Sequence, residues 1–164
     1  MNANTIDIFN RIKGEIYLGN ASAAKNLPLL NTHSITHVLI CCSEIGPSFA
    51  EKLTYKKLNI QETFDFNISS FFNEAYDFIE SCLASGGAIL IHCVQGQSRS
   101  PTILISYLMR RFRLNLSKAL QIVKKNHPQT EPNLGFMEQL QTYEKNLSES
   151  MTTTTCSTCT CQIQ

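Results

Sequence analysis

A cysteine and an arginine stand six positions apart in the stretch AILIHCVQGQSRSPTI, residues 88–103. Cys93 follows one apolar run and Arg99 precedes another, so a strand, a tight loop and a helix are expected in that order. The backbone N–H groups of such a loop and the first turn of the following helix converge on a point of positive potential, where an oxyanion binds. The sequence therefore predicts a phosphate-binding loop with a thiol at its entrance.

The side chains of this loop suit nucleophilic attack on a phosphate monoester. The N–H dipoles of the loop stabilise the thiolate form of Cys93 relative to the thiol. Arg99 carries a planar guanidinium that can hold two phosphate oxygens at once, and Gly96 permits a turn that a side chain would hinder. Attack by the thiolate gives a phosphocysteine intermediate, which water then hydrolyses. The structural alternative is that Cys93 only ends a strand and Arg99 only caps a helix.

The same stretch resembles the signature of the protein tyrosine phosphatase superfamily, in which His and Cys are followed by five residues, Arg, and Ser or Thr. The ending Ser98-Arg99-Ser100 is similar to the dual-specificity subgroup. So are the order and spacing of IYLGNASAAKN, ITHVLICC, FNISSFFNEAYDFIE, PTILISYLM and EPNLGFMEQL. The resemblance implies a cysteine phosphatase fold with the phosphate-binding loop between a strand and a helix. It also implies a protein phosphatase that hydrolyses phosphotyrosine, phosphoserine and phosphothreonine.

The resemblance further implies a role for each residue of the motif. Cys93 is expected to be the nucleophile and Arg99 to bind the phosphate, while backbone N–H groups come from Val94, Gln95, Gly96, Gln97 and Ser98. His92 is expected to orient the loop and help to keep the thiolate; it can also be a satisfied core histidine, and the two roles are compatible. Ser100 is expected to hydrogen-bond Cys93 and ease breakdown of the phosphoenzyme, and its alternative role is to cap the helix at Pro101.

The sequence departs from the family pattern at the residue that donates a proton to the leaving oxygen. The family takes this proton from an Asp on a loop upstream of the signature. In LNIQETFDFNISS an ungapped alignment places Glu62 at that position, and Asp65 is the nearby carboxylate. We favour Glu62, because position relative to the preceding strand matters more than residue type. Asp65 is the alternative, and a third possibility is that both are solvated loop charges.

The loop side chains between Cys93 and Arg99 are all neutral. Relatives that act on phosphoinositides tend to carry Lys in this loop, and those that act on RNA 5′ ends carry an Asn-Arg-Thr ending. We therefore expect a shallow cleft that accepts phosphoproteins and needs no metal or other cofactor. Two rival functions are a phosphoinositide phosphatase and a phosphoprotein-binding module that holds its ligand without cleaving it.

Composition limits the class of protein. A chain of 164 residues, 43% hydrophobic and 16% charged, fits one globular domain. The balance of 14 Lys and Arg against 13 Asp and Glu gives no basic field for nucleic acid. No apolar run approaches the ~20 residues of a membrane-spanning helix. The first residues, MNANTIDIFNRIKGE, show neither a signal-peptide core nor Gly at position 2, so a cytoplasmic protein is expected.

Strands that alternate with helices, followed by a helical second half, predict a single α/β domain over residues 8–147 with a mostly parallel central sheet flanked by helices. Strands are expected at 14–20, 36–42, 53–60 and 88–92. Helices are expected at 22–33, 69–87 (capped by Ser69 or Ser70), 101–112, 115–128 and 133–147. The strand at 88–92 and the helix at 101–112 hold the two ends of the phosphate-binding loop.

The seven cysteines do not resemble a disulfide framework, because their number is odd and three crowd at one end. Cys41, Cys42 and Cys82 lie in apolar surroundings and are expected in the core.

Residues 148–164 are predicted to form a polar, disordered tail. The last four match a C-a-a-X box, which predicts farnesylation of Cys161 and peripheral membrane attachment, with Cys159 and Cys156 as candidate second, acylated anchors. The alternatives are incidental cysteines and half of a zinc site.

Overall fold

Five strands form one sheet in the computed structural model, which describes residues 4–6 and 14–154 and the side chains of residues 14–149. The strand order is β1-β2-β5-β3-β4. Strands β2, β5, β3 and β4 run parallel, and β1 is antiparallel to β2, so the prediction of a mostly parallel sheet is confirmed. The strands are β1 (Asn4–Ile6), β2 (Glu15–Gly19), β3 (Ile35–Ile40), β4 (Thr54–Lys57) and β5 (Ala88–His92).

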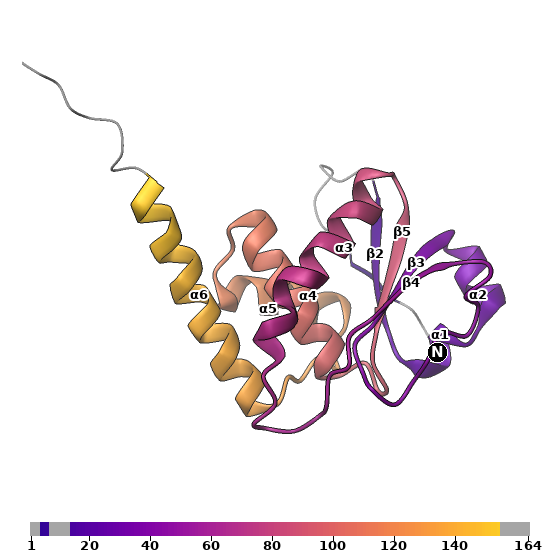
Figure 1. Ribbon diagram of the computed structural model, residues 1–164, viewed down its shortest axis with the longest axis horizontal. Coiled ribbons are helices and arrows are strands. Elements are labelled where there is room, and N and C mark those ends of the chain that lie inside the picture. Colours follow the sequence, from indigo (N-terminus) through magenta and orange to yellow (C-terminus); the bar gives the residue numbers. More distant parts are fainter. Residues whose placement is uncertain (1–3, 7–13, 155–164) are drawn as a thin grey trace, which may run out of the picture.

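Helices cover both faces of this sheet. Helices α3 to α6 lie on one side, and α1 and α2 lie on the other (Figure 1). Because both faces are covered, the central strand β5 has all five residues buried, as its continuous apolar run predicts. The helices are α1 (Ala21–Ala24), α2 (Leu27–Thr32), the 3₁₀ helix η1 (Ile68–Phe71), α3 (Phe72–Ala84), α4 (Arg99–Phe112), α5 (Leu116–Asn126) and α6 (Leu134–Thr154).

Helix α4 is the central helix. Every residue from Arg99 to Met109 is buried, because α3, α5, α6 and the strands β2 and β5 all pack against it. Pro101 lies in its first turn, where no intrahelical N–H is lost. The expected order of buried strand, loop and central helix is therefore present, and it fixes both ends of residues 93–98.

Two local expectations are wrong, and one strand was not foreseen. The single helix expected at 22–33 is two short helices, because Asn26 caps a new helix through Leu29 N at 3.1 Å and Pro28 lies in its first turn. The helix expected from Ser69 begins as η1, and the first residue of α3 has no side-chain cap. Strand β1 was not expected, since three residues carry too short a pattern, and it precedes the predicted domain start at residue 8.

Helix α6 continues past the predicted end of the domain. It runs to Thr154, so the expectation that the chain is disordered after Leu147 is wrong for residues 148–154. The stretch SESMTTT contains neither Gly nor Pro to end the helix, and Ser148 Oγ donates back to the Glu144 carbonyl at 3.0 Å. Residues 155–164, with Cys156, Cys159 and Cys161, lie outside the described residues.

Cys41, Cys42 and Cys82 are fully buried and free, which confirms their expected place in the core. Their neighbours are apolar side chains of the same core. Burial raises the pKa of the Cys41 and Cys82 thiols, so both remain neutral. They therefore act as small hydrophobic residues.

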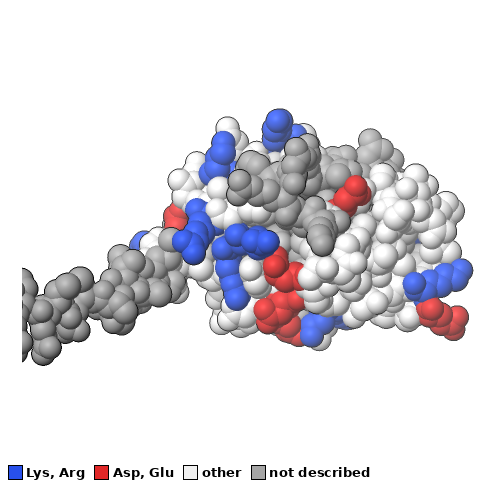
Figure 2. Space-filling view, turned by 90° about the horizontal axis from the view of Figure 1, so that it is seen from above, with Lys and Arg blue, Asp and Glu red and all other residues white. Residues whose placement is uncertain are grey.

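Charges of both signs share the surface. Figure 2 shows one face on which basic and acidic side chains lie next to one another. At the end of α4, Arg111 pairs with Glu80 at 3.0 Å, and the Arg110 guanidinium lies 3.7 Å from the centre of the Tyr76 ring. These cations also suit the negative end of the α4 dipole. In the part of the chain that the structure describes, no helix has the length and apolarity needed to cross a membrane.

Candidate active site

Hydrogen bonds from neighbouring segments to its carbonyl oxygens hold the loop of residues 93–98 in place. Four of these oxygens accept hydrogen bonds from neighbouring elements: Val94 O from Ala21 N (3.0 Å), Gly96 O from His127 Nε2 (2.8 Å), Gln97 O from Glu131 N (2.7 Å) and Ser98 O from Thr102 N (3.0 Å). With the carbonyls occupied on the outer side, the N–H groups of the loop are the ones left for the inner side. This arrangement is that of an anion-binding loop.

Gly96 is required at the turn of the loop. Its φ is +76°, a conformation that residues with a side chain rarely adopt, and an added Cβ would lie 2.6 Å from the Gly19 carbonyl oxygen. The close approach brings the loop against the end of β2. It also directs the Gly96 N–H toward Cys93 Sγ, 3.2 Å away.

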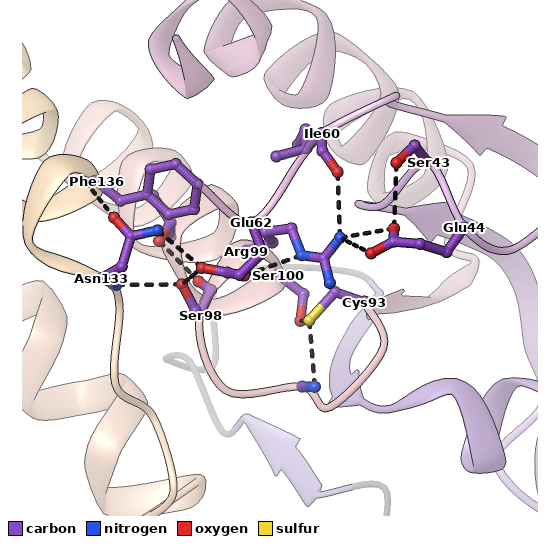
Figure 3. Close-up of polar contacts among 12 residues, drawn as sticks. Ser43, Glu44, Ile60, Glu62, Cys93, Ser98, Arg99, Ser100, Asn133 and Phe136 are labelled. Atoms are coloured by element: carbon purple, nitrogen blue, oxygen red, sulfur yellow. Dashed lines mark hydrogen bonds and ion pairs between the residues drawn. The ribbon is translucent and has the colours of Figure 1, made fainter. Parts of the chain in front are cut away.

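The sulfur of Cys93 accepts two hydrogen bonds. One comes from Gly96 N, and the other from the Ser100 hydroxyl at 3.3 Å (Figure 3). Two donors directed at one sulfur suit a thiolate better than a thiol. Helix α4 already begins at Arg99, so Ser100 lies inside its first turn and is not the cap expected as its alternative role.

Two neutral histidines bind the backbone of the loop. Burial lowers the pKa of His92 to about 4, and it also lowers the pKa of His127. His92 Nδ1 lies 3.2 Å from the Cys93 carbonyl, and His127 Nε2 bonds the Gly96 carbonyl. Since a carbonyl oxygen only accepts, each of these ring nitrogens must carry the proton. His92 therefore orients the loop as a neutral donor and brings no positive charge to Cys93.

Arg99 is buried, and carboxylates hold its guanidinium. Nη1 donates to both Glu44 oxygens, at 2.8 and 2.7 Å, and to the Ile60 carbonyl at 3.2 Å. Nε lies 3.0 Å from Glu62 Oε2, oriented as an ion pair without an aligned hydrogen bond. The third nitrogen, Nη2, points toward Cys93 (Figure 3). The guanidinium is thus fixed at Nη1. Nη2 can bind an oxyanion, and Nε can do so where the oxyanion replaces Glu62.

Glu44 was not foreseen from the sequence. Burial is the largest single influence and would raise its pKa, but the hydrogen bonds from Arg99, its own backbone and Ser43, together with the charge of Arg99, lower the pKa overall. Conversely, burial would lower the pKa of Arg99, and the bonds to Glu44 with the charges of Cys93, Glu44 and Glu62 raise it. Both groups are therefore charged, and Glu44 keeps Arg99 in one orientation. Glu44 follows β3 in a loop without a recognisable motif, so only the fold brings it to Arg99.

Glu62 and Asp65 lie in different surroundings. Glu62 Oε1 accepts from Ser98 Oγ at 2.7 Å and from Asn133 Nδ2 at 2.8 Å. Asp65 is exposed on the following turn and does not line the pocket. The structure therefore brings Glu62, and not Asp65, to Cys93 and Arg99.

These side chains surround one pocket of about 320 Å³. Among the residues that the structure describes, Arg99 is the only Lys or Arg in its lining, although three carboxylates belong to it. Asn133 and Glu131 were missed from the sequence as site residues, because they precede α6 in a stretch that predicts only the start of a helix. The pocket is lined by Glu44, Glu62, Cys93, Val94, Gln95, Gln97, Ser98, Arg99, Glu131 and Asn133.

Residues 16–146 match the family described as "Dual specificity phosphatase, catalytic domain". Dual specificity protein phosphatase 1 of Arabidopsis thaliana is 38% identical over 139 residues, which cover 85% of this chain and 70% of that protein. Dual specificity protein phosphatase 1B of the same plant is 34% identical over 138 residues, covering 84% of this chain and 83% of that protein.

Solved structures agree with these matches. The human tyrosine phosphatase-like serine/threonine/tyrosine-interacting protein is 35% identical with a TM-score of 0.75, covering 80% of this chain and 91% of that chain. A mouse putative dual specificity phosphatase complexed with zinc tungstate is 30% identical with a TM-score of 0.79, covering 83% and 86%. The α/β fold described above is therefore shared with these proteins.

Proposed function

Because the chain belongs to the dual specificity phosphatase family, we propose that Cys93, Arg99 and Glu62 carry out the reaction of that family in this protein. The protein is a cysteine-dependent phosphatase that hydrolyses phosphotyrosine, phosphoserine and phosphothreonine monoesters through a phosphocysteine. One observation carries the assignment of residues. Cys93 and Arg99 lie at the two ends of one loop and face a single pocket, and the carbonyl groups of that loop accept hydrogen bonds from neighbouring segments.

In the first step, the Cys93 thiolate attacks phosphorus and the bond from phosphorus to the ester oxygen breaks. Nε and Nη2 of Arg99 and the loop N–H groups bind the three non-bridging oxygens, whose charge they stabilise. The leaving oxygen keeps the electron pair of the broken bond and takes a proton from Glu62. For this to occur, the phosphate must replace Glu62 as the partner of Arg99 Nε.

In the second step, water attacks phosphorus and the bond from phosphorus to sulfur breaks. The Glu62 carboxylate left by the first step accepts a proton from this water, so the same residue serves as acid and then as base. The Ser100 hydroxyl, 3.3 Å from Cys93 Sγ, donates to the sulfur as its negative charge returns. Inorganic phosphate then leaves, and Glu62 is protonated again.

The pocket favours phosphoproteins over phosphoinositides. Phosphoinositide head groups carry several phosphates, whereas Arg99, already paired with two carboxylates, is the only cation that the described part of the chain contributes to the lining. Phosphotyrosine, phosphothreonine and phosphoserine peptides are expected to be turned over, and a soluble phosphoinositide head group at least about ten-fold more slowly, since each missing charge contact weakens binding. Release of inorganic phosphate measures both rates, and an equal rate on the head group would favour the phosphoinositide alternative.

Glu62→Gln is expected to lower kcat on a phosphoserine peptide by about 10²- to 10³-fold, because the alkoxide then leaves without a proton. Asp65→Asn is the matched control and is expected to retain full activity. Steady-state phosphate release from the same peptide gives both values. A collapse in Asp65→Asn with full activity in Glu62→Gln would move the acid role to Asp65.

We also propose a cytoplasmic protein with peripheral membrane attachment through Cys161. The support is the C-a-a-X pattern Cys161-Gln162-Ile163-Gln164, which lies outside the described residues. Such a box is recognised at a carboxyl terminus, so the test uses the chain ending at Gln164. After incubation with a farnesyl donor and transferase, intact mass should rise by one farnesyl group, and Cys161→Ser should show no increase. An unchanged wild-type mass would exclude this modification.

A further inference from the structure

Two donors converge on a single oxygen of Glu62. Ser98 Oγ lies 2.7 Å and Asn133 Nδ2 2.8 Å from Oε1, while Oε2 faces Arg99 (Figure 3). From this geometry we propose that Asn133, with Ser98, is the positioning residue of the general acid and decides which oxygen of Glu62 carries the transferable proton. The inference rests on the acid role proposed above for Glu62.

Asn133 is itself fixed at two points besides its bond to Glu62. Its Oδ1 accepts from Phe136 N at 2.9 Å, so it caps helix α6, and its backbone N donates to Ser98 Oγ at 3.2 Å. Only Nδ2 remains, and it is directed at Glu62. Because one end of the amide is held by the cap, the other end cannot turn away from Glu62. Asn133 thus connects α6, the phosphate-binding loop and the acid.

A glutamate needs this support more than an aspartate would. Its side chain has one more rotatable bond than the Asp of the family pattern, and 37% of the Glu62 side chain is exposed. Without hydrogen-bond partners, the exposed Glu62 side chain could adopt several rotamers. Hydrogen bonds from two donors on different elements select the rotamer in which Oε2 reaches the pocket.

The same bonds determine where the proton resides. A carboxyl oxygen has two lone-pair directions, and on Oε1 both are taken by Ser98 and Asn133. The proton of the acid form must therefore lie on Oε2. When phosphate binds Arg99 Nε, Oε2 loses its ion-pair partner and faces the ester oxygen. The proton passes from Oε2 to that oxygen as the bond to phosphorus breaks.

Asn133→Asp tests the inference, because a carboxylate still accepts from Phe136 N but cannot donate to Glu62. We expect kcat on phenyl phosphate, whose leaving group needs a proton, to fall about 10- to 100-fold, within the range of acid catalysis. On p-nitrophenyl phosphate, whose leaving group needs little help, kcat should fall less than about three-fold. KM should change little for both. Asn133→Ser, which also caps a helix but cannot reach Glu62, should give the same pattern.

Asn115→Asp is the matched control. Asn115 caps α5 by accepting from Lys118 N at 2.8 Å, and it lies outside the pocket. The same chemical change there should leave both rates unchanged.

Glu62→Gln separates the two levels of the proposal. If Glu62→Gln steepens the dependence on the leaving group and neither Asn133 variant does, the positioning role is overturned and the acid role stands. If Glu62→Gln leaves that dependence unchanged, the acid role fails and the inference fails with it. Equal losses on both substrates in the Asn133 variants would also overturn the inference, since they indicate a structural effect.

Discussion

Cys93→Ser is expected to abolish hydrolysis of phosphopeptides while leaving their binding nearly intact. The bond to phosphorus forms at the sulfur, and a serine hydroxyl is not ionised by the hydrogen bonds from Gly96 and Ser100 that suit a thiolate. Loss of a nucleophile commonly costs kcat about 10⁴- to 10⁶-fold. The groups that bind phosphate, Arg99 and the loop N–H groups, are unchanged.

Two measurements check this expectation. Phosphate release from a phosphotyrosine peptide should fall to background, and fluorescence anisotropy of the labelled peptide should still report binding. Cys82→Ser is the matched control, because Cys82 is buried in α3 outside the pocket and its Sγ lies 3.9 Å from the Thr36 hydroxyl, a partner for serine. Turnover retained by Cys93→Ser would assign the nucleophile elsewhere. Binding without turnover in the wild type would favour the binding-module alternative.

Arg99→Lys is expected to lower kcat/KM by about 10³-fold although it preserves the charge. Three guanidinium nitrogens have separate tasks here: Nη1 binds Glu44 and Ile60, Nε faces Glu62, and Nη2 points toward Cys93. One ammonium group cannot serve all three directions. Paired with either glutamate, it would be drawn away from the phosphate.

Hydrolysis of p-nitrophenyl phosphate and the inhibition constant of tungstate, an oxyanion, measure this loss. Both should weaken in Arg99→Lys, because catalysis and oxyanion binding use the same nitrogens. Arg111→Lys is the control on the same helix, since Arg111 is half-exposed, pairs with Glu80 and lies outside the pocket. Undiminished tungstate affinity in Arg99→Lys would contradict the assignment of Arg99 as the phosphate-binding residue.

The phosphate-binding loop could be predicted from the sequence because its parts are contiguous. A buried strand, Cys93, Gly96, Arg99 and a buried helix follow one another, so local pattern and local chemistry agree. The parallel sheet could also be predicted, because the alternation of strands and helices is visible along the chain. The choice of Glu62 over Asp65 also depended on position along the chain, and the fold places Glu62 at the pocket.

The supporting residues could not be predicted in this way. Glu44 reaches Arg99 from the segment after β3, whereas His127 and Asn133 reach the loop and Glu62 from the connection between α5 and α6. Each looks locally like an ordinary polar residue, and Asn133 looks only like a helix cap. The extension of α6 was missed for a different reason, because a run of Ser and Thr predicts disorder by composition but contains no residue that ends a helix.

Helix α6 is long enough to place its last residue far from the active-site pocket. The helix starts beside Asn133 at the rim of the pocket and ends at Thr154, and its 21 residues span about 30 Å. The end of α6 at Thr154 therefore lies away from the end that borders the pocket. A label or immobilising group attached at Thr154 would thus be about 30 Å from the pocket along the helix.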